Sequence, residues 1–173
     1  MKKNIFYLIL LLFFTFIFTI FYIGLDKPNF YTPKEIKNKS LEEFTSTELF
    51  SNEQFSSNDI IENNKFTLIN IWSSWCVPCR LEHSVLMDLS KKTDLNIVGL
   101  NYKDKKNNAI KFLNELGNPF SKILTDPDGI VSISLGAYGV PETFLLNNKS
   151  KIIRKYIGPL TKENILEIIK IIK

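Results

Sequence analysis

Hydrophobic and polar residues divide the chain into three parts. The run from Ile5 to Leu25 carries no charge over 21 residues. About 20 apolar residues span the hydrocarbon core of a bilayer, so residues 1–25 are predicted to form a membrane anchor. No small-x-small cleavage site follows the run, and we expect the anchor to stay uncleaved. The polar residues 26–40 predict a linker, and residues 41–173 predict one folded domain.

The first half of this domain alternates strand and helix patterns. The nearly continuous apolar run Phe66–Trp72 predicts a strand buried on both faces. Apolar residues in 77–92 recur on one helical face, and residues 95–102 predict a second buried strand. A further helical pattern covers residues 109–116 and ends at Gly117, a residue typical of helix C-termini. This β-α-β-α order predicts parallel strands.

The second half predicts a short strand, a short helix, a hairpin and a final helix. In chain order, these elements cover residues 121–124, 130–135, 142–146 with 152–157, and 162–172. Thr161 is the expected N-cap of the final helix. Upstream, residues 44–55 indicate an edge hairpin and residues 59–61 a short helical turn. We therefore expect an α/β domain with a central mixed sheet flanked by helices.

The two cysteines of the chain, Cys76 and Cys79, stand where the first predicted strand meets a helix. The positive end of the helix dipole lowers the pKa of a thiol at this position. A disulfide between them would close a loop too short to stabilise the fold much through chain entropy, which favours a chemical role. We expect Cys76 to be exposed and to attack a substrate disulfide, and Cys79, one turn below, to resolve the mixed disulfide.

Other cysteine chemistries fit the sequence poorly. Covalent haem attachment needs C-x-x-C-H, and Arg80 stands in the histidine position. A structural zinc site needs about four ligands, and His83 is the only histidine that could join the two cysteines. We expect His83 to be a surface or boundary side chain. The expected catalytic groups are therefore the redox-active cysteines alone, with no metal and no other cofactor.

The distribution of charge argues against nucleic acid as a partner, but it does not decide the orientation of the anchor. The chain has 22 Lys and Arg against 18 Asp and Glu, a formal net charge of +4. No basic stripe with interleaved aromatic residues is present, so we expect no nucleic-acid binding. Lys2 and Lys3 before the anchor favour a cytoplasmic N-terminus. The lysines that follow the anchor argue for the opposite orientation: Lys27, Lys34, Lys37 and Lys39.

The residues around the cysteines favour a reductant over a strong oxidant. Strong oxidants of this chemistry stabilise the reduced form with a thiolate of very low pKa, and Val77-Pro78 supplies no charge for that purpose. Glu82 and Glu142 are expected to add negative potential and so raise the pKa of the thiol. Arg80 would oppose them, but we expect it to point to solvent.

Two motifs resemble the thioredoxin superfamily. Residues 66–79 (FTLINIWSSWCVPC) resemble its first central strand and active site, and residues 139–144 (GVPETF) resemble its proline loop. The resemblance implies a thioredoxin-like fold with Pro141 in the cis form facing the cysteine pair. It also implies that Val140 and Pro141 pair with an extended substrate chain. Trp75 would offer an apolar contact surface beside Cys76.

More narrowly, the chain is similar to the membrane-anchored thiol–disulfide reductases of cytochrome c maturation, the DsbE/CcmG group. The matching features are the anchor, WCVPC with Arg80 and Glu82-His83, Asn101-Tyr102-Lys103-Asp104, Gly117-Asn118-Pro119-Phe120, GVPETF and Gly158-Pro159-Leu160. Two residues depart from the expected patterns. Asn70 stands where thioredoxin has a buried aspartate, so the resemblance implies that Glu82 takes over proton handling; the alternative is a solvated helix glutamate. Ser84 stands where we expect proline in this group.

This resemblance implies a place and partners for the domain. It would lie in the periplasm, tethered to the bacterial inner membrane by residues 5–25, with the N-terminus in the cytoplasm. It would reduce the C-x-x-C-H cysteines of apocytochrome c, directly or through another maturation protein. A membrane disulfide transporter would supply the electrons. The alternatives are a general periplasmic reductase of other targets and a non-catalytic thioredoxin-like assembly module.

Overall fold

The computed structural model describes residues 2–25, 39–61 and 64–173. The chain divides into two compact units, residues 1–34 and 35–173. The predicted linker, residues 26–40, lies outside the described residues except for its last two positions.

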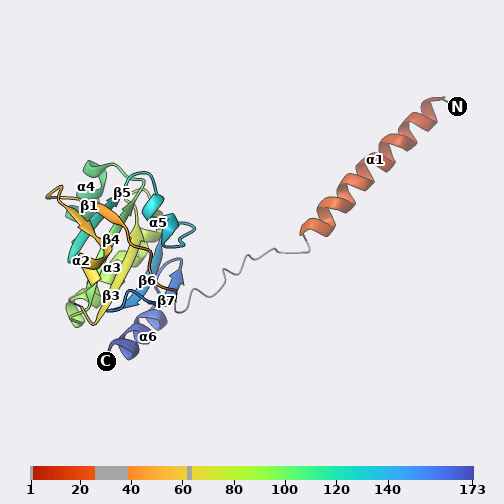
Figure 1. Ribbon diagram of the computed structural model, residues 1–173. Helices are drawn as coiled ribbons and strands as arrows, with labels where there is room; N and C mark the ends of the chain where they lie inside the picture. The colour runs from red at the N-terminus through yellow and green to blue at the C-terminus, as the bar shows by residue number, and fades with distance from the viewer. Residues whose placement is uncertain (1, 26–38, 62–63) are drawn as a thin grey trace. The chain divides into compact units, whose positions relative to one another are not determined.

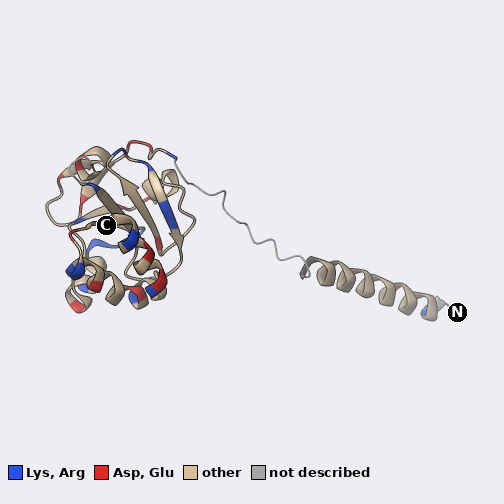
Figure 2. Ribbon diagram, turned by 90° about the horizontal axis from the view of Figure 1, so that it is seen from below, with Lys and Arg blue, Asp and Glu red and all other residues tan. Residues whose placement is uncertain are grey.

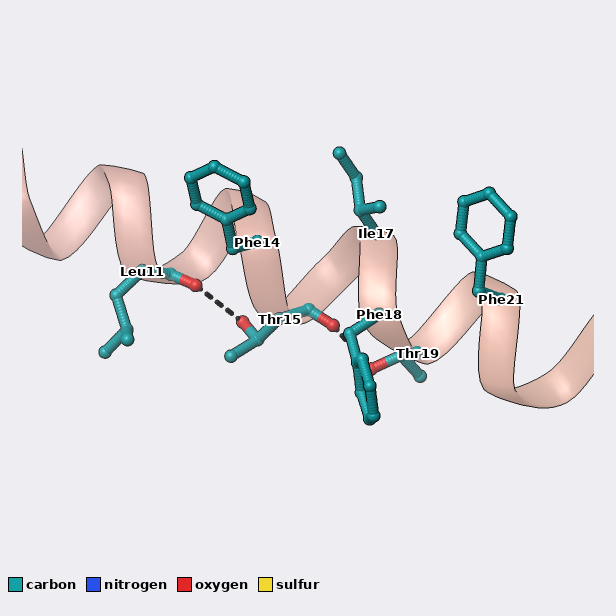
Figure 3. A pocket seen from close by; sticks show the side chains of 7 residues that line it. All are labelled: Leu11, Phe14, Thr15, Ile17, Phe18, Thr19 and Phe21. Carbon is teal, nitrogen blue, oxygen red and sulfur yellow. Dashed lines mark hydrogen bonds between the residues drawn. The ribbon is translucent and has the colours of Figure 1, made fainter.

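The first unit contains the helix α1 (Lys2–Leu25), which is long and apolar enough to cross a membrane. Figure 2 shows it free of charged residues except near its N-terminus. The Thr15 hydroxyl donates to the Leu11 carbonyl oxygen at 3.0 Å, and the Thr19 hydroxyl donates to that of Thr15 at 2.7 Å (Figure 3). Since lipid offers no hydrogen-bond partners, these internal bonds suit the hydrocarbon core. The side chains that line the hollow in Figure 3 all belong to this one helix.

The second unit carries seven strands and five helices within its described residues (Figure 1). Its strands are β1 (Thr45–Glu48), β2 (Gln54–Ser56), β3 (Phe66–Trp72), β4 (Asn96–Tyr102), β5 (Lys122–Asp126), β6 (Glu142–Asn147) and β7 (Ile152–Ile157). Its helices are α2 (Ser57–Ile61), α3 (Val77–Lys92), α4 (Lys106–Leu116), α5 (Ile130–Ser134) and α6 (Lys162–Ile172). The expected order of elements is confirmed, with bounds that differ from the predicted ones by only a few residues.

The strands form one mixed sheet in the order β2-β1-β5-β4-β3-β6-β7. β3 pairs in parallel with β4, and β4 in parallel with β5, as the β-α-β-α pattern predicted. β6 pairs antiparallel with β3, with Asn70 opposite Thr143 and Ile71 opposite Glu142. The expected edge hairpin is β1 with β2. The central strand β3 therefore has one parallel and one antiparallel neighbour.

Helices cover both faces of the sheet, and a hydrophobic cluster lies under each set. α3, α4 and α6 pack on the face that carries Leu68, Trp72 and Leu145. α2 and α5 pack on the face that carries Ile69 and Phe144. The alternation of side chains along β3 and β6 assigns each residue of these strands to one face. The mixed sheet flanked by helices is confirmed.

Gly99, in the middle of β4, allows two large aromatic rings to pack directly on the sheet. A Cβ at Gly99 would lie 2.8 Å from Trp72 Nε1 and 2.9 Å from the Phe120 ring. These two rings stack with their centroids 5.6 Å apart, and both belong to the cluster that contains the cysteines.

We predict that Gly99→Ala destabilises the domain by about 1–3 kcal/mol, because overpacking forces the rings or the strand to move. Urea unfolding of the oxidised full chain in detergent, followed by tryptophan fluorescence, measures the change. Gly139→Ala is the matched control, since a Cβ there meets nothing within 4 Å. Equal unfolding midpoints for the two variants would contradict the tight packing at Gly99.

Candidate functional site

The cysteine pair lies where β3 leads into α3. Cys76 and Cys79 form a disulfide with an S–S distance of 2.03 Å. Cys76 is the N-cap of α3, and its Sγ accepts a hydrogen bond from the backbone N–H of Cys79 at 3.1 Å. Pro78 occupies the first turn, where its missing N–H has no cost. This geometry puts the first sulfur at the positive end of the helix dipole, which favours its thiolate.

Cys76 is less accessible than the sequence suggested. We expected an exposed thiol, but Cys76 is only 4% exposed in the disulfide form. The reason is that it is bonded to buried Cys79 and belongs to the same hydrophobic cluster. Its neighbours Trp75 and Val77 are exposed instead, at 57% and 69%. The apolar surface beside the disulfide is therefore formed by the residues that flank Cys76.

Glu82 is buried one helical turn after Cys79. Its Oε1 accepts from Asn70 Nδ2 at 2.9 Å, and its Oε2 accepts from the backbone N–H of Leu160 at 2.7 Å. Asn70 Nδ2 also donates to the Thr143 hydroxyl at 3.0 Å. Burial raises the pKa of the Glu82 carboxyl, and the hydrogen bonds from Leu160 and Asn70 partly oppose that rise. The alternative of a solvated helix glutamate is wrong.

Glu142 is also buried, but it lies on the other face of the sheet. It stands opposite Ile71 on β3, whereas Glu82 bonds to Asn70, the residue before it. Its carboxylate pairs with Lys155 Nζ at 2.8 Å and accepts the backbone N–H of Tyr138 at 2.8 Å. We expected Glu142 to add negative potential at the cysteines. The sheet separates it from them and Lys155 neutralises its charge, so that expectation has no support in the geometry.

The proline loop lies against the cluster that contains the cysteines. The Val140–Pro141 peptide bond is cis. Val140 is half-buried and packs against both hydrophobic clusters, while Pro141 is buried. The Pro141 carbonyl accepts from the N–H of Gly158 at 3.0 Å, and the Gly139 N–H donates to Glu142 at 3.1 Å. Glu142 therefore holds the loop that leads to Pro141.

The two side chains that follow the cysteines on α3 are not where we expected them. His83 is 3% exposed rather than at the surface, because its ring packs edge-on against Phe112. Its Nε2 lies 2.9 Å from the Gly117 carbonyl oxygen and donates to it. Burial, the largest cause, lowers the pKa of His83. Arg80 does not simply point to solvent: it pairs with Glu115 at 3.3 Å and lies over the Phe112 ring.

No group of three or more His, Cys, Asp and Glu side chains in the described ranges could hold a metal ion. His83, which we considered as a third ligand, donates to a carbonyl and packs among aromatic rings.

One residue that contacts the active-site loop was missed as a site residue. Asp104, after β4, accepts hydrogen bonds from both the backbone N–H and the hydroxyl of Ser74. In the sequence, Asp104 stood out only as the last residue of Asn101-Tyr102-Lys103-Asp104, one of the motifs that carry a resemblance. The available signal was topological: Asp104 follows the strand parallel to β3, and the carboxyl ends of parallel strands lie at the same edge of a sheet.

Comparisons with known proteins agree with this geometry. The profile of the Redoxin family matches residues 36–169. The thiol:disulfide interchange protein CycY of Rhizobium leguminosarum bv. viciae is 48% identical over 103 residues, which are 60% of this chain and 55% of that protein. The chain therefore spans about half the length of this relative.

Two further proteins extend the comparison over most of the chain. The "Probable thiol:disulfide interchange protein DsbE-2" of Pasteurella multocida is 35% identical over 162 residues, 94% of this chain and 85% of that protein. The crystal structure of the thioredoxin domain of a thiol-disulfide oxidoreductase from Bacteroides vulgatus has a TM-score of 0.67 at 19% identity. It covers 79% of this chain and 98% of that chain. The thioredoxin-like fold is thereby confirmed.

Three observations together assign the chain to a family. A cysteine pair forms a disulfide at the start of a helix, a cis-proline loop lies against the same hydrophobic cluster, and known thiol:disulfide interchange proteins match most of the chain. The chain belongs to the Redoxin family and, within it, to the DsbE-type thiol:disulfide interchange proteins, a group of thiol–disulfide oxidoreductases.

Proposed function

We propose that this chain is a membrane-anchored periplasmic reductant that reduces the haem-binding cysteines of apocytochrome c. The observation that carries the exchange chemistry is the buried carboxyl of Glu82 one turn below the disulfide, bonded to Asn70 and Leu160. The choice of apocytochrome c as substrate rests on the resemblance of the sequence motifs. A carboxyl at this place can receive the proton that the buried thiol of Cys79 must lose before it reacts.

The reaction proceeds in two exchange steps. In the reduced protein, the Cys76 thiolate attacks one sulfur of the substrate disulfide, and the other substrate sulfur leaves as a thiolate. The thiol of Cys79 then gives its proton to Glu82, and its sulfur attacks Cys76 Sγ. The second substrate sulfur leaves, and the Cys76–Cys79 disulfide forms. Two electrons pass from the protein to the substrate, which takes up two protons as it becomes a dithiol.

The charges around the pair favour reduction over oxidation. Val77-Pro78 carries no charge between the cysteines. The Arg80 guanidinium is held by Glu115 and lies over the Phe112 ring, which leaves it poorly placed to stabilise a thiolate. Glu82, once ionised, raises the pKa of the buried thiol. Because none of these groups stabilises the thiolates strongly, the dithiol is not favoured over the disulfide as it is in a strong oxidant, and the pair tends to give up its electrons.

Docking of substrate would use the surface around the disulfide. Trp75 and Val77 offer exposed apolar side chains, and Val140 lies in the loop before Pro141. An extended chain that pairs with the backbone at Val140 would bring its cysteines to Cys76. By resemblance, a peptide containing C-x-x-C-H is the substrate, and a membrane disulfide transporter restores the dithiol. The apolar helix α1 suits a single-pass anchor. We place the N-terminus in the cytoplasm and the domain in the periplasm, because a reductant outside the cytoplasm needs a dedicated supply of electrons.

We predict that Cys79→Ala, in the full chain and its native membrane, accumulates a mixed disulfide on Cys76, because the second step cannot occur. Mass spectrometry of the captured proteins identifies the targets, and we expect apocytochrome c or its maturation partners. Cys76→Ala is the control and should capture nothing. Capture of oxidase-pathway substrates alone would contradict the cytochrome assignment, and no capture at all would favour a non-catalytic assembly module.

We predict that Glu82→Gln slows the second step by about 100-fold, because an amide cannot accept the proton of Cys79. The first attack does not need that proton transfer, so the mixed disulfide should build up although Cys79 is present. Acid quenching and mass spectrometry of the reaction with an oxidised C-x-x-C-H peptide measure its amount. Glu53→Gln, at an exposed glutamate between β1 and β2, is the control. Equal amounts of mixed disulfide in both variants would contradict the role of Glu82.

We also predict a pH-dependent gain in stability for Glu82→Gln in the oxidised chain. Burial raises the pKa of Glu82 in the folded state above the ordinary 4.5. Between these two values the folded state binds more protons than the unfolded state, so the wild-type chain loses stability as pH rises. The variant lacks this loss. The amount by which the unfolding free energy of the variant exceeds that of the wild-type chain should grow as pH rises through this window and be constant below it. An advantage that does not change with pH would contradict the raised pKa.

A further inference from the structure

Two successive residues of the active-site loop are bonded to two successive residues of the loop after β4. The backbone N–H of Ser74 donates to Asp104 Oδ2 at 2.6 Å, and the Ser74 hydroxyl donates to Asp104 Oδ1 at 2.8 Å. The indole N–H of Trp75 donates to the carbonyl oxygen of Lys103 at 3.1 Å. These three bonds hold the two residues that immediately precede Cys76 in the sequence.

The Asp104 carboxylate also organises its own loop. It accepts from Asn101 Nδ2 at 3.2 Å and from the backbone N–H of Lys105 at 2.8 Å, so four donors converge on its two oxygens. Asn101 is itself 3% exposed at the end of β4. Hydrogen bonds to a carboxylate are roughly twice as strong as bonds between neutral groups. The loop is therefore tied to the central sheet at one end and to Ser74 at the other.

The backbone between these contacts has an unusual conformation. Lys103 has a φ of 44°, in the left-handed region that side chains other than glycine seldom adopt. Its N–H donates to the Asp126 carbonyl at 2.9 Å. A Cβ at Gly129 would come within 2.6 Å of Lys103 Cε, so the turn after β5 packs closely on this residue. Such a conformation persists where surrounding contacts determine it, and it directs the Lys103 carbonyl toward Trp75.

Trp75 depends on this bond because burial does not fix its ring. The side chain is 57% exposed, whereas Trp72, three residues earlier, is 1% exposed in the core. An exposed ring on a turn is free to change rotamer unless its indole N–H is held. The Lys103 carbonyl holds the indole, and Asp104 holds the backbone one residue before it.

We propose that Asp104 is a positioning residue, which holds the Ser74–Trp75 turn so that the Trp75 ring and Cys76 together face the incoming substrate disulfide. This inference rests on the proposed function, since it concerns the first exchange step at the same site. Misplacement of a reacting group by about 1 Å can cost on the order of 100-fold in rate. Asp104 touches no reacting atom; it acts through Ser74 and through the loop that carries Lys103.

The test compares a docked substrate with one that needs no docking. Reduced full chain in detergent is mixed with an oxidised C-x-x-C-H peptide or with a small aromatic disulfide, 5,5′-dithiobis(2-nitrobenzoic acid). We expect Asp104→Ala to lower the rate constant for the peptide by about 10- to 100-fold. The small disulfide should react within about twofold of the unmodified chain, because its attack does not use the Trp75 surface.

Two measurements report whether the Ser74–Trp75 turn is held in place, and neither depends on catalysis. Asp104→Ala should speed hydrogen exchange at the Ser74 amide, because that N–H loses its acceptor. It should also increase acrylamide quenching of Trp75, whose signal is obtained by subtracting the spectrum of Trp75→Phe. Ser74→Ala removes only the hydroxyl bond and should give a smaller effect in each measurement. Asp88→Ala removes the same charge from an exposed position on α3 and is the matched control.

Asp104→Asn separates geometry from charge. It keeps an oxygen that can accept from the Ser74 N–H, so we expect a peptide rate between those of Asp104→Ala and the unmodified chain. If both variants lose the peptide reaction equally and shift the pH profile of the small disulfide equally, Asp104 acts through its charge, and the inference fails. If Asp104→Ala lowers both reactions in proportion to its loss of thermal stability, the role is only structural, and it also fails.

Failure of the proposed function would look different. If the unmodified chain reduced the small disulfide but not the peptide, the cytochrome assignment would fail. The exchange and quenching measurements would still decide whether Asp104 holds the turn. If Asp104→Ala proved too unstable to study, Ser74→Ala and Asp104→Asn would carry the comparison. An unchanged peptide rate in Asp104→Asn, together with unchanged Trp75 quenching in both of these variants, would overturn the inference.

Discussion

The pairing of β3 with its two neighbours determines where every group of the site lies. β3 ends beside the start of α3, which carries the cysteines, and its antiparallel partner β6 begins directly after Pro141. Its parallel partner β4 ends in the loop that carries Asp104. One strand thus brings the disulfide, the proline loop and the Asp104 loop to the same edge of the sheet. A slip of one residue in this register would move Asn70 to the opposite face and separate it from Glu82.

The same register separates the two buried glutamates. Asn70 and Ile71 are adjacent on β3 and therefore face opposite sides of the sheet. Glu82 bonds to Asn70 under α3, while Glu142 stands opposite Ile71 and pairs with Lys155. The sequence motifs predicted both carboxylates near the cysteines, because Glu82 follows them closely along the chain and Glu142 lies in the proline loop. Only the pairing of the strands reveals that Glu82 lies on the face covered by α3, whereas Glu142 lies on the other face and bonds to the proline loop.

Much of the fold could be predicted because the local hydrophobic pattern of the sequence indicates its helices and strands. β3, α3 and α6 follow the hydrophobic pattern residue for residue, and Thr161 caps α6 with its side chain as expected. The environments of His83 and Cys76 could not be predicted in this way. His83 is polar and sits on a helix, yet it is buried because Phe112, on α4, closes over it. Such burial depends on contacts between elements that are distant in the sequence, and periodicity does not report them.

The Asn70–Glu82 contact bears on the proton transfer that we propose for the second exchange step. Burial raises the pKa of Glu82 and so disfavours the carboxylate, which is the form that could take a proton from Cys79. Asn70 and the Leu160 N–H each donate to one of its oxygens, which favours the carboxylate and limits the rise of its pKa. A second acid in place of Asn70 would disfavour that carboxylate by repulsion. The amide at position 70 is therefore the appropriate partner, since it offers donors without adding a charge that competes for the same proton.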